Sequence, residues 1–368
     1  MLQPRQRIIQ LPTIVHGGIH YAEIEKLTIQ PQNIMDFSVS HNPYGPPAEV
    51  LAVLNSVCIS DYPDPEAKEL RRHLSERLKV KPENLLAGSG ATELVRLAAM
   101  AYFDPGDRVL IPQPTYGEYE IAARIMGAQP IKEPVLEEAT HFSLDIKNLL
   151  RSIERYRPKG VFLCNPNNPT GQCVTREDIA KAVAAASDCL FIIDEAYIAL
   201  VDNAEIFSSL ELIHHGNVLI LRSMTKDFAL AGLRLGYVVA APQIIEALRK
   251  VCPPWNVNAL AQSAGIAALR AEGYIEECRE KIRLAKEFLL RRLSNIGLTA
   301  IPSQANFFLV KVGSAKNFHR ALLQKGFLVR DCSSFELPEY VRISPRTIPE
   351  CDKLITAVKE VLKDRNWT

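Results

Sequence analysis

The stretch from residue 190 to residue 226 reads LFIIDEAYIALVDNAEIFSSLELIHHGNVLILRSMTK. It contains two short apolar runs, residues 190–193 and 218–221, and each run ends in polar residues. Apolar runs of this length predict buried strands, and the segment between them is long enough for one crossover to a parallel neighbour. Asp194 and Lys226 follow the two runs at a separation of 226 − 194 = 32 residues, so we expect both at one edge of a sheet.

The same alternation extends toward the N-terminus. Short apolar runs bounded by Gly and Pro are separated by segments with helical spacing. The expected strands lie near residues 85–88, 108–112, 160–164, 190–194 and 217–222, and the expected helices near residues 66–78, 91–103, 117–127 and 176–187. This order predicts an α/β fold with a large domain, in which helices flank a mostly parallel sheet.

The rhythm changes after the segment PPWNVNALAQ at residues 253–262. A long helical region is expected over residues 259–296, followed by short apolar runs and a last helix near residues 349–362, which predicts a smaller α+β domain. We therefore divide the chain into an N-terminal arm that packs with the small domain (1–45), a large cofactor-binding domain (46–255) and a small C-terminal domain (256–368).

The composition excludes several classes of protein. The chain has 368 residues, of which 47% are hydrophobic and 23% charged, and this argues against disorder. A formal net charge of +1 gives no general attraction to nucleic acid or to anionic membranes, and no stretch approaches about 18 apolar residues. Eight cysteines without a CxxC pair favour free thiols over disulfides or structural zinc, and the N-terminus does not resemble a secretory signal. We expect a cytoplasmic protein with no metal, no nucleic-acid partner and no membrane span.

A glycine-rich turn follows the first expected strand. Residues 88–93 read GSGATE and lead into a helix, whose N-terminus could hold an anion. The third Gly of a dinucleotide fingerprint is replaced by Glu93, and the GK[ST] of a P-loop is absent. Alone, the turn indicates either a phosphate cup or an ordinary tight connection between a strand and a helix.

Three polar side chains follow other strands. Asp194 ends an apolar run, Lys226 lies between hydroxyl residues beyond the next strand, and Arg234 lies between glycines. A buried carboxylate needs a partner, a lysine at a strand end can form an imine with a carbonyl cofactor, and arginine suits a phosphate. Two of them have a plainer interpretation, since Asp194 could cap a helix and Lys226 could be a solvated surface lysine.

Together these positions match the chemistry of one cofactor. A pyridine aldehyde that carries a phosphate needs an amine for its aldehyde, an acid for its ring nitrogen and a cup for its phosphate. We expect Lys226 and Asp194 to supply the first two, and Asn168 to offer its amide to the ring oxygen. The phosphate is expected against Ala91, Thr92, Ser223, Thr225 and Arg234.

Eight motifs extend this match along the chain. They are NPYGPP (42–47), DYPDPE (61–66), GSGATE (88–93), PTYGEY (114–119), NPNNPTG (165–171), DEAY (194–197), SMTK (223–226) and GLRLGY (232–237). As a set they resemble the class I/II aminotransferases of fold type I, which use pyridoxal 5'-phosphate, over about residues 16–362. Within that family the chain is most similar to the branch that contains histidinol-phosphate aminotransferase and L-threonine-O-3-phosphate decarboxylase.

The resemblance implies a role for each matching residue. Lys226 matches the Schiff-base lysine that also shuttles a proton, and Asp194 matches the acid at the ring nitrogen. Tyr197 matches a second donor to the ring oxygen. The remaining matches are Gly90 in the phosphate cup, Tyr116 stacked on the ring, Tyr62 at the cofactor phosphate of a partner subunit, and Arg342 on the substrate α-carboxylate. The match of Tyr62 implies a homodimer with shared active sites.

The substrate side departs from the family pattern more than the cofactor side does. Arg330 matches an arginine that binds a substrate phosphate, although a plain salt bridge would explain it as well. His16 and Gly18, in the segment HGG, resemble the decarboxylase. Ser40 stands where the decarboxylase has an asparagine, and His41 replaces an apolar residue.

Three reactions therefore stay open for a polar L-amino acid or its phosphate ester. Transamination, in which Lys226 moves the α-proton, ranks first because the motif set is commonest in aminotransferases. Decarboxylation would need Arg342 to hold the carboxylate differently. Elimination or cyclisation of a hydroxylated amino acid could use His16, Ser40 and His41 as acid–base groups.

Two non-enzymatic classes fit less well. A transcription regulator on this fold would need an added DNA-binding domain, and the roughly 40 residues before the core motifs carry no helix–turn–helix pattern. A binding protein without catalytic activity would be expected to have lost Lys226 or Asp194, and both are present.

Overall fold

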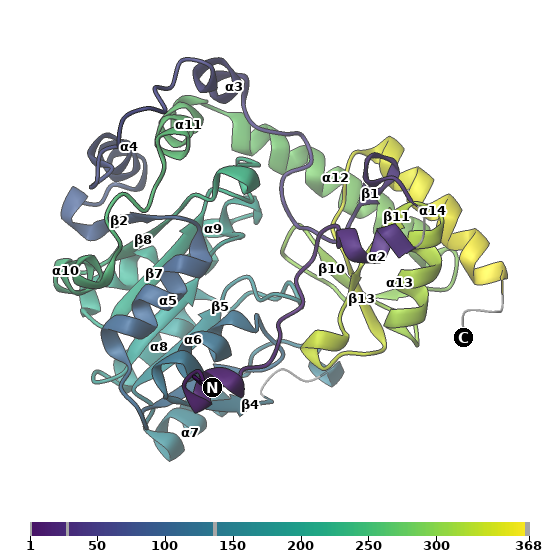
Figure 1. The fold of residues 1–368 in the computed structure, drawn as a ribbon. Coiled ribbons are helices and arrows are strands. Elements are labelled where there is room, and N and C mark those ends of the chain that lie inside the picture. The colour runs from purple at the N-terminus through teal and green to yellow at the C-terminus, as the bar shows by residue number, and fades with distance from the viewer. Residues whose placement is uncertain (1, 27–28, 135–137, 365–368) are drawn as a thin grey trace.

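A seven-stranded sheet organises the larger part of the molecule in the computed structural model, which describes residues 2–26, 29–134 and 138–364 (Figure 1). The strand order is β2-β8-β7-β6-β5-β3-β4, and among these strands β8 alone runs antiparallel to its neighbours. The strands are β2 (Leu85–Gly88), β3 (Arg108–Pro112), β4 (Gln129–Glu133), β5 (Gly160–Cys164), β6 (Leu190–Asp194), β7 (Val218–Ser223) and β8 (Gly236–Ala240). The predicted mostly parallel sheet is thus confirmed.

Strands β6 and β7 are parallel neighbours, with Asp194 opposite Leu221 in their register. Asp194 is the last residue of β6, and Lys226 lies just beyond Ser223, where β7 ends. Both residues therefore stand at the carboxyl edge of the sheet, as the spacing of the two apolar runs predicted.

Helices cover both faces of this sheet. One face packs against α5 (Ala91–Tyr102), α6 (Glu118–Met126) and α10 (Pro242–Val251), and the other against α4 (Lys68–Leu78), α7 (Ile146–Tyr156), α8 (Arg176–Ala185) and α11 (Ala259–Arg270). Helix α3 (Ala48–Leu54) packs on α11. Along β6, Leu190 and Ile192 face the first group while Phe191 and Ile193 face the second. Because both faces are buried, the central strands are apolar until they reach their carboxyl ends.

A second, antiparallel sheet has the order β12-β13-β10-β9. Its elements are β9 (Thr299–Ala300), β10 (Phe308–Lys311), β12 (Arg330–Asp331) and β13 (Tyr340–Ile343), with helices α12 (Tyr274–Ser294), α13 (Ala315–Gln324) and α14 (Ile348–Lys363). The three helices share one core with Phe308, Val310, Val341 and Ile343. They therefore cover one face of the small sheet, and residues of alternate parity, such as Leu309 and Arg342, project from the opposite face.

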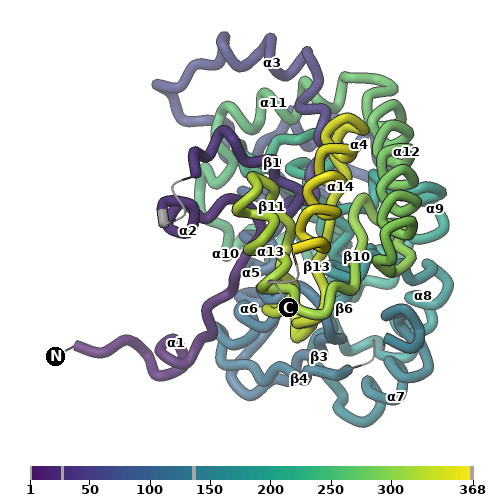
Figure 2. The backbone as a smooth tube through the Cα atoms, turned by 90° about the vertical axis from the view of Figure 1, so that its right-hand side faces the viewer, coloured from purple at the N-terminus to yellow at the C-terminus, as the bar shows by residue number. Residues whose placement is uncertain are grey.

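The N-terminal arm runs from the large sheet to the small one (Figure 1). Its first helix, α1 (Gln6–Ile9), contacts α6, and its strand β1 (Met35–Asp36) pairs in parallel with β11 (Phe327–Leu328). Helix α2 (Tyr21–Lys26) lies between these two elements in the chain, and in Figure 2 the N-terminal end of the arm projects from the body of the molecule. The predicted domain boundaries at residues 45/46 and 255/256 stay a prediction.

The single long helix expected over residues 259–296 is divided in two. Helix α11 ends at Arg270 and α12 begins at Tyr274, because Gly273 between them adopts a left-handed conformation with φ +72°. Helix α4 begins at residue 68 rather than 66, where the Asp64 side chain accepts hydrogen bonds from the backbone N–H groups of residues 66 and 68. The expected helices near residues 91, 117, 176 and 349 begin within one residue of those positions.

Short helices fill several connections. They are α9 (Ala204–Phe207) and the 3₁₀ turns Pro31–Asn33, Pro82–Asn84, Glu138–Thr140, Ile198–Leu200, Leu210–His215, Ala231–Leu233 and Ser333–Phe335. Within the described ranges, none of the helices combines the length and the apolar character that a membrane crossing requires.

Candidate active site

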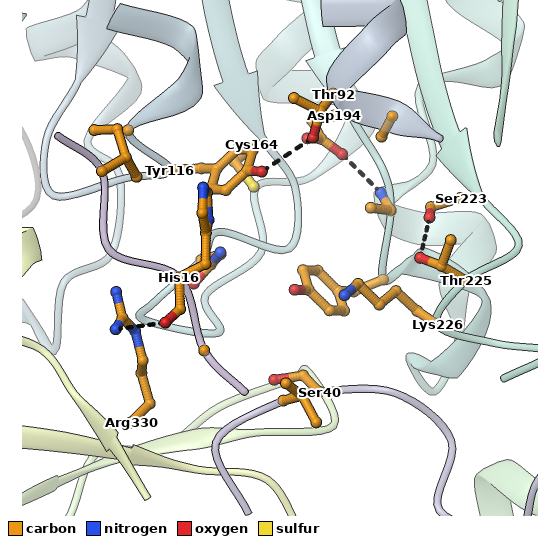
Figure 3. Close-up of a pocket in the computed structure, with 18 of the residues that line it drawn as sticks. His16, Ser40, Thr92, Tyr116, Cys164, Asp194, Ser223, Thr225, Lys226 and Arg330 are labelled. Atoms are coloured by element: carbon orange, nitrogen blue, oxygen red, sulfur yellow. Dashed lines mark hydrogen bonds between the residues drawn. The ribbon is translucent and has the colours of Figure 1, made fainter. Parts of the chain in front are cut away.

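A cavity of about 190 Å³ opens between the carboxyl edge of the large sheet and the small sheet (Figure 3). The predicted site residues that line it are His16, Ser40, Ala91, Thr92, Tyr116, Asn168, Asp194, Tyr197, Ser223, Thr225, Lys226, Arg234, Arg330 and Arg342. These residues come from the arm, from both sheets and from α5, so the fold gathers segments that are far apart in the sequence. Gly18, His41, Tyr62 and Gly90 do not line this cavity.

Asp194 is buried in the cavity wall without an ion-pair partner among the described residues. Its Oδ2 accepts a hydrogen bond from the Tyr119 hydroxyl at 2.7 Å, and its Oδ1 accepts one from the backbone N–H of Ala196 at 3.0 Å. Burial raises the pKa of the Asp194 carboxyl group, and the two hydrogen bonds oppose that rise. A buried carboxylate is costly unless a cation meets it, so this position suits a protonated ring nitrogen.

Lys226 reaches into the same cavity from the loop after β7. Burial, together with the guanidinium groups of Arg342 and Arg234, lowers the pKa of its amine to about 8. Its Nζ lies 5.7 Å from the centre of the Tyr197 ring. Because the neutral amine is the nucleophile, this pKa makes Lys226 reactive toward an aldehyde near neutral pH.

Hydroxyl groups and a guanidinium form a cup beside the N-terminus of α5. The Ser223 and Thr225 hydroxyls lie 2.7 Å apart and line the cavity with Arg234 and the first residues of α5. Gly90 has φ +83°, and a Cβ there would lie 2.7 Å from Arg234 Nη2, so only glycine lets the guanidinium lie this close. A helix N-terminus, two hydroxyls and an arginine are donors that suit a phosphate group, so the cup fits the phosphate of pyridoxal phosphate.

Two tyrosines and an asparagine also line the cavity. The Tyr116 hydroxyl is 3.2 Å from Thr92 Oγ1, and burial raises the pKa of Tyr116 to about 12. Burial likewise raises the pKa of Tyr197. Both phenols therefore stay protonated and can donate hydrogen bonds, while Asn168 Oδ1 accepts one from Arg342 Nη1.

Arg330 and Arg342 lie directly opposite each other on β12 and β13. Arg342 also donates to the backbone carbonyl of Ser38 at 2.7 Å, and its Nε has no partner among the described residues. Arg330 donates to the carbonyls of Val15 and His16 and to the hydroxyl of Ser334. Burial and the neighbouring Arg342 lower the pKa of Arg330 to about 10. Within the described part of the chain, neither guanidinium has a carboxylate partner.

The arm closes one side of the cavity. His16 Nε2 lies 3.1 Å from Glu118 Oε1 on α6, and the His16 ring lies 6.0 Å from that of Tyr116. Gly18 lies beyond this wall, where its backbone N–H donates to Ser38 Oγ at 2.8 Å, and it lines a neighbouring cavity instead.

Of three other predicted residues, Ser40 lines the cavity and His41 and Tyr62 lie outside it. Ser40 lines the cavity, and its Oγ lies 2.7 Å from Ser344 Oγ. His41 lies outside, and burial, followed by the charge of Lys226, lowers its pKa. Tyr62 is 80% exposed and stacks on Trp255 with ring centres 4.5 Å apart, so it does not reach the cavity of its own chain.

Several residues that lie in or beside the site are not among those predicted from the sequence. Tyr119 donates to Asp194, Glu118 holds His16, and Phe307 lies under the Arg342 guanidinium at 4.9 Å. Tyr119 follows Tyr116 by three residues, a helical spacing that reads as ordinary core packing. Asp194, which accepts the hydrogen bond from the Tyr119 hydroxyl, lies 75 residues away in the chain, so no local pattern could have indicated this role of Tyr119.

An open α/β sheet with a lysine, an acid and a phosphate cup along its carboxyl edge characterises the pyridoxal-phosphate enzymes of fold type I. The chain belongs to one family of that class: the profile of the family "Aminotransferase class I and II" matches residues 32–358. It is accordingly a pyridoxal-phosphate-dependent transferase.

Several known proteins are similar to this chain over most of its length. Histidinol-phosphate aminotransferase of Thermoanaerobacter pseudethanolicus is 36% identical over 331 residues, which cover 88% of this chain and 92% of that protein. The histidinol-phosphate aminotransferase of Sinorhizobium meliloti, solved in complex with pyridoxal-5'-phosphate, has a TM-score of 0.87 at 24% identity over 99% of this chain and 98% of its own. L-threonine-O-3-phosphate decarboxylase of Porphyromonas gingivalis has a TM-score of 0.77 at 27% identity, with coverages of 89% and 99%.

Proposed function

We propose that this enzyme transfers the amino group of a small amino compound that carries a phosphate ester, of which L-histidinol phosphate is the type, to an acidic 2-oxo acid. The observation that carries this proposal is the pair of opposed, buried cations Arg330 and Arg342, which have no carboxylate partner in the described residues. Such a pair favours a substrate with a phosphate dianion or two carboxylates over a neutral one. The names of the relatives support the same substrate class.

Each group of residues has a proposed part in the reaction. When bound, pyridoxal phosphate supplies an electron sink for the bonds of the substrate α-carbon. Asp194 holds the proton at the ring nitrogen, and Tyr119 orients that carboxylate. Lys226 Nζ would hold the cofactor covalently when substrate is absent and would move the α-proton during turnover. Ala91, Thr92, Ser223, Thr225, Arg234 and Gly90 hold the phosphate, and Tyr116, Tyr197 and Asn168 hold the ring.

A substrate panel with one variant tests the proposal. Wild-type enzyme is mixed separately with L-histidinol phosphate, L-threonine O-3-phosphate, L-glutamate and L-phenylalanine, and the cofactor spectrum, carbon dioxide and ammonia are followed. We expect conversion to the pyridoxamine form with L-histidinol phosphate, called the phosphorylated amine below, and with glutamate. For the phosphorylated amine, Arg330→Ala should raise KM by about 10- to 100-fold, the effect of one charge-assisted contact, with little change for phenylalanine.

Other outcomes of the panel would contradict the proposal. Release of carbon dioxide would identify a decarboxylase, and release of ammonia or water without amino transfer would identify an elimination or cyclisation. An equal preference for phenylalanine and the phosphorylated amine would show that Arg330 does not select an anion.

We propose further that the enzyme is a homodimer with shared active sites. Ile59, Tyr62 and Trp255 are exposed and line one hollow outside the cavity, which favours association. The expected mass in solution is twice 41.0 kDa. The Tyr62→Ala and Lys226→Ala variants should each be inactive alone. When they are unfolded and refolded together in equal amounts, about a quarter of wild-type activity should return, because half of the random dimers are mixed and each mixed dimer has one intact site of its two. If a mixture that contains mixed dimers recovered no activity, that result would contradict shared active sites.

We also assign the enzyme to the cytoplasm. The eight cysteines are all free, as expected for a reducing compartment. Detection of the native enzyme outside that compartment in fractionated cells would overturn this assignment.

A further inference from the structure

Asn42, the first residue of the NPYGPP motif, is buried with 0% exposure where the arm leads into α3. Its backbone N–H and both polar atoms of its side-chain amide have hydrogen-bond partners. The side-chain Oδ1 accepts a hydrogen bond from the backbone N–H of Tyr44 at 3.0 Å, which fixes the orientation of the amide. The backbone N–H and the side-chain Nδ2 of Asn42 are left as donors to other parts of the chain.

These donors hold the main chain of the active-site lysine. The backbone N–H of Asn42 donates to the carbonyl of Lys226 at 2.7 Å, and its side-chain Nδ2 donates to the carbonyl of Asp227 at 3.0 Å. Residues 224–230 lie beyond the end of β7 in neither a helix nor a strand, so the sheet does not satisfy these carbonyls. One residue of the arm thus satisfies two consecutive carbonyls at the lysine.

We call Asn42 and the two carbonyls that it holds the clasp. A third hydrogen-bond partner connects the clasp to α12. Asn42 Nδ2 also lies 3.1 Å from the hydroxyl of Tyr274, the first residue of α12, and that hydroxyl in turn donates to the carbonyl of Gly45. The Tyr274 ring is nearly parallel to Phe228, with ring centres 6.2 Å apart. The loop of Lys226 is therefore held from the arm and from the helix that leads into the small sheet.

We propose that Asn42 is a positioning residue for Lys226: by holding the carbonyls of Lys226 and Asp227 it sets the point from which the lysine side chain reaches the cofactor and the substrate α-carbon. The inference rests on the proposed role of Lys226. The lysine amine stands at the end of a flexible four-carbon chain, so a small freedom of the main chain becomes a larger displacement at Nζ, and reactions at Nζ depend steeply on its placement.

The test compares Asn42→Ala, which removes the side-chain bond to the Asp227 carbonyl and keeps the backbone bond to Lys226, with a matched control, Asn84→Ala. Asn84 also donates its side-chain amide to a backbone carbonyl, that of Ala240 at 2.8 Å, but it does not line the cavity. Apoenzyme is prepared with hydroxylamine, and the rate at which pyridoxal phosphate reattaches is followed by absorbance. We expect Asn42→Ala to slow reattachment about fivefold and kcat about tenfold, with KM within twofold, while Asn84→Ala leaves all three near wild type.

Reattachment and kcat of folded Asn42→Ala holoenzyme within twofold of wild type would overturn the inference, even if its Tm fell. If Asn42→Ala does not fold, Tyr274→Phe, which removes only the hydroxyl beyond the clasp, is measured in the same way. It should slow reattachment by a smaller factor, and no slowing would equally overturn the inference. A parallel Lys226→Ala preparation separates failure of the role proposed for Lys226 from failure of the role proposed for Asn42. If Lys226→Ala still attaches the cofactor covalently, the proposed role of Lys226 fails. If Lys226→Ala does not attach it and Asn42→Ala behaves as wild type, only the role of Asn42 fails.

Discussion

Lys226→Ala should reduce kcat by about 10⁴-fold or more, because it removes both the amine that binds the cofactor and the base that moves the α-proton. The variant should also lose the absorbance of the covalently held cofactor while keeping the fold, since the Lys226 side chain makes no ion pair in the described structure. Steady-state kinetics and absorbance spectra of the purified variant measure both effects.

Another lysine with a lowered pKa provides the control. Lys286 on α12 is also shielded from water, which lowers its pKa, but its Nζ donates to the backbone carbonyls of Ser303 and Ala305 outside the cavity. Lys286→Ala should lower Tm and leave the cofactor bound and turnover nearly unchanged. A Lys226→Ala enzyme with a kcat near that of the wild type would refute the assignment of the base.

Asp194→Asn should lower kcat by roughly 10²- to 10³-fold, because a nearly isosteric amide cannot hold a proton on the ring nitrogen by charge. Tyr119→Phe provides a graded comparison, since it keeps the carboxylate and deletes only the 2.7 Å hydrogen bond. We expect that variant to lose about tenfold or less. Stopped-flow measurement of the half-reaction with the best amino donor separates this chemical step from product release.

The relative size of the two decreases in kcat shows whether the carboxylate of Asp194 or the hydroxyl of Tyr119 is the functional group. If Asp194→Asn retained kcat within about threefold of wild type, a charged partner at the ring nitrogen would not be required. If Tyr119→Phe lost more than Asp194→Asn, the hydroxyl rather than the carboxylate would be the functional group at this position.

The cofactor side of the site could be predicted because its residues follow strands. A parallel sheet brings the ends of its strands together, so Asp194 and Lys226 could be placed side by side from two apolar runs and their spacing. The same reasoning could not identify Tyr119, whose importance depends on a partner 75 residues away. It also could not bring Arg330 opposite Arg342, because that pairing depends on the register of two short antiparallel strands.

Some elements lack the local pattern that would reveal them. Strand β4 (Gln129–Glu133) lies at the sheet edge with one neighbour and carries exposed and half-exposed polar residues, so its sequence is not an apolar run. Strand β8 (Gly236–Ala240) is apolar throughout, but it begins at the last residue of the GLRLG segment, where the sequence predicts a phosphate contact. Its antiparallel direction fits the connection after β7, which contains one 3₁₀ turn (Ala231–Leu233) and no crossover helix.

Reduction of the holoenzyme with borohydride, followed by proteolysis and mass spectrometry, locates the covalent bond on which this account depends. We predict a pyridoxyl phosphate mass on the peptide that contains Lys226 and on no other peptide. The same mass on a different lysine, or the absence of any labelled peptide from an active and coloured enzyme, would contradict the assignment of Lys226 and with it the mechanism proposed for this site.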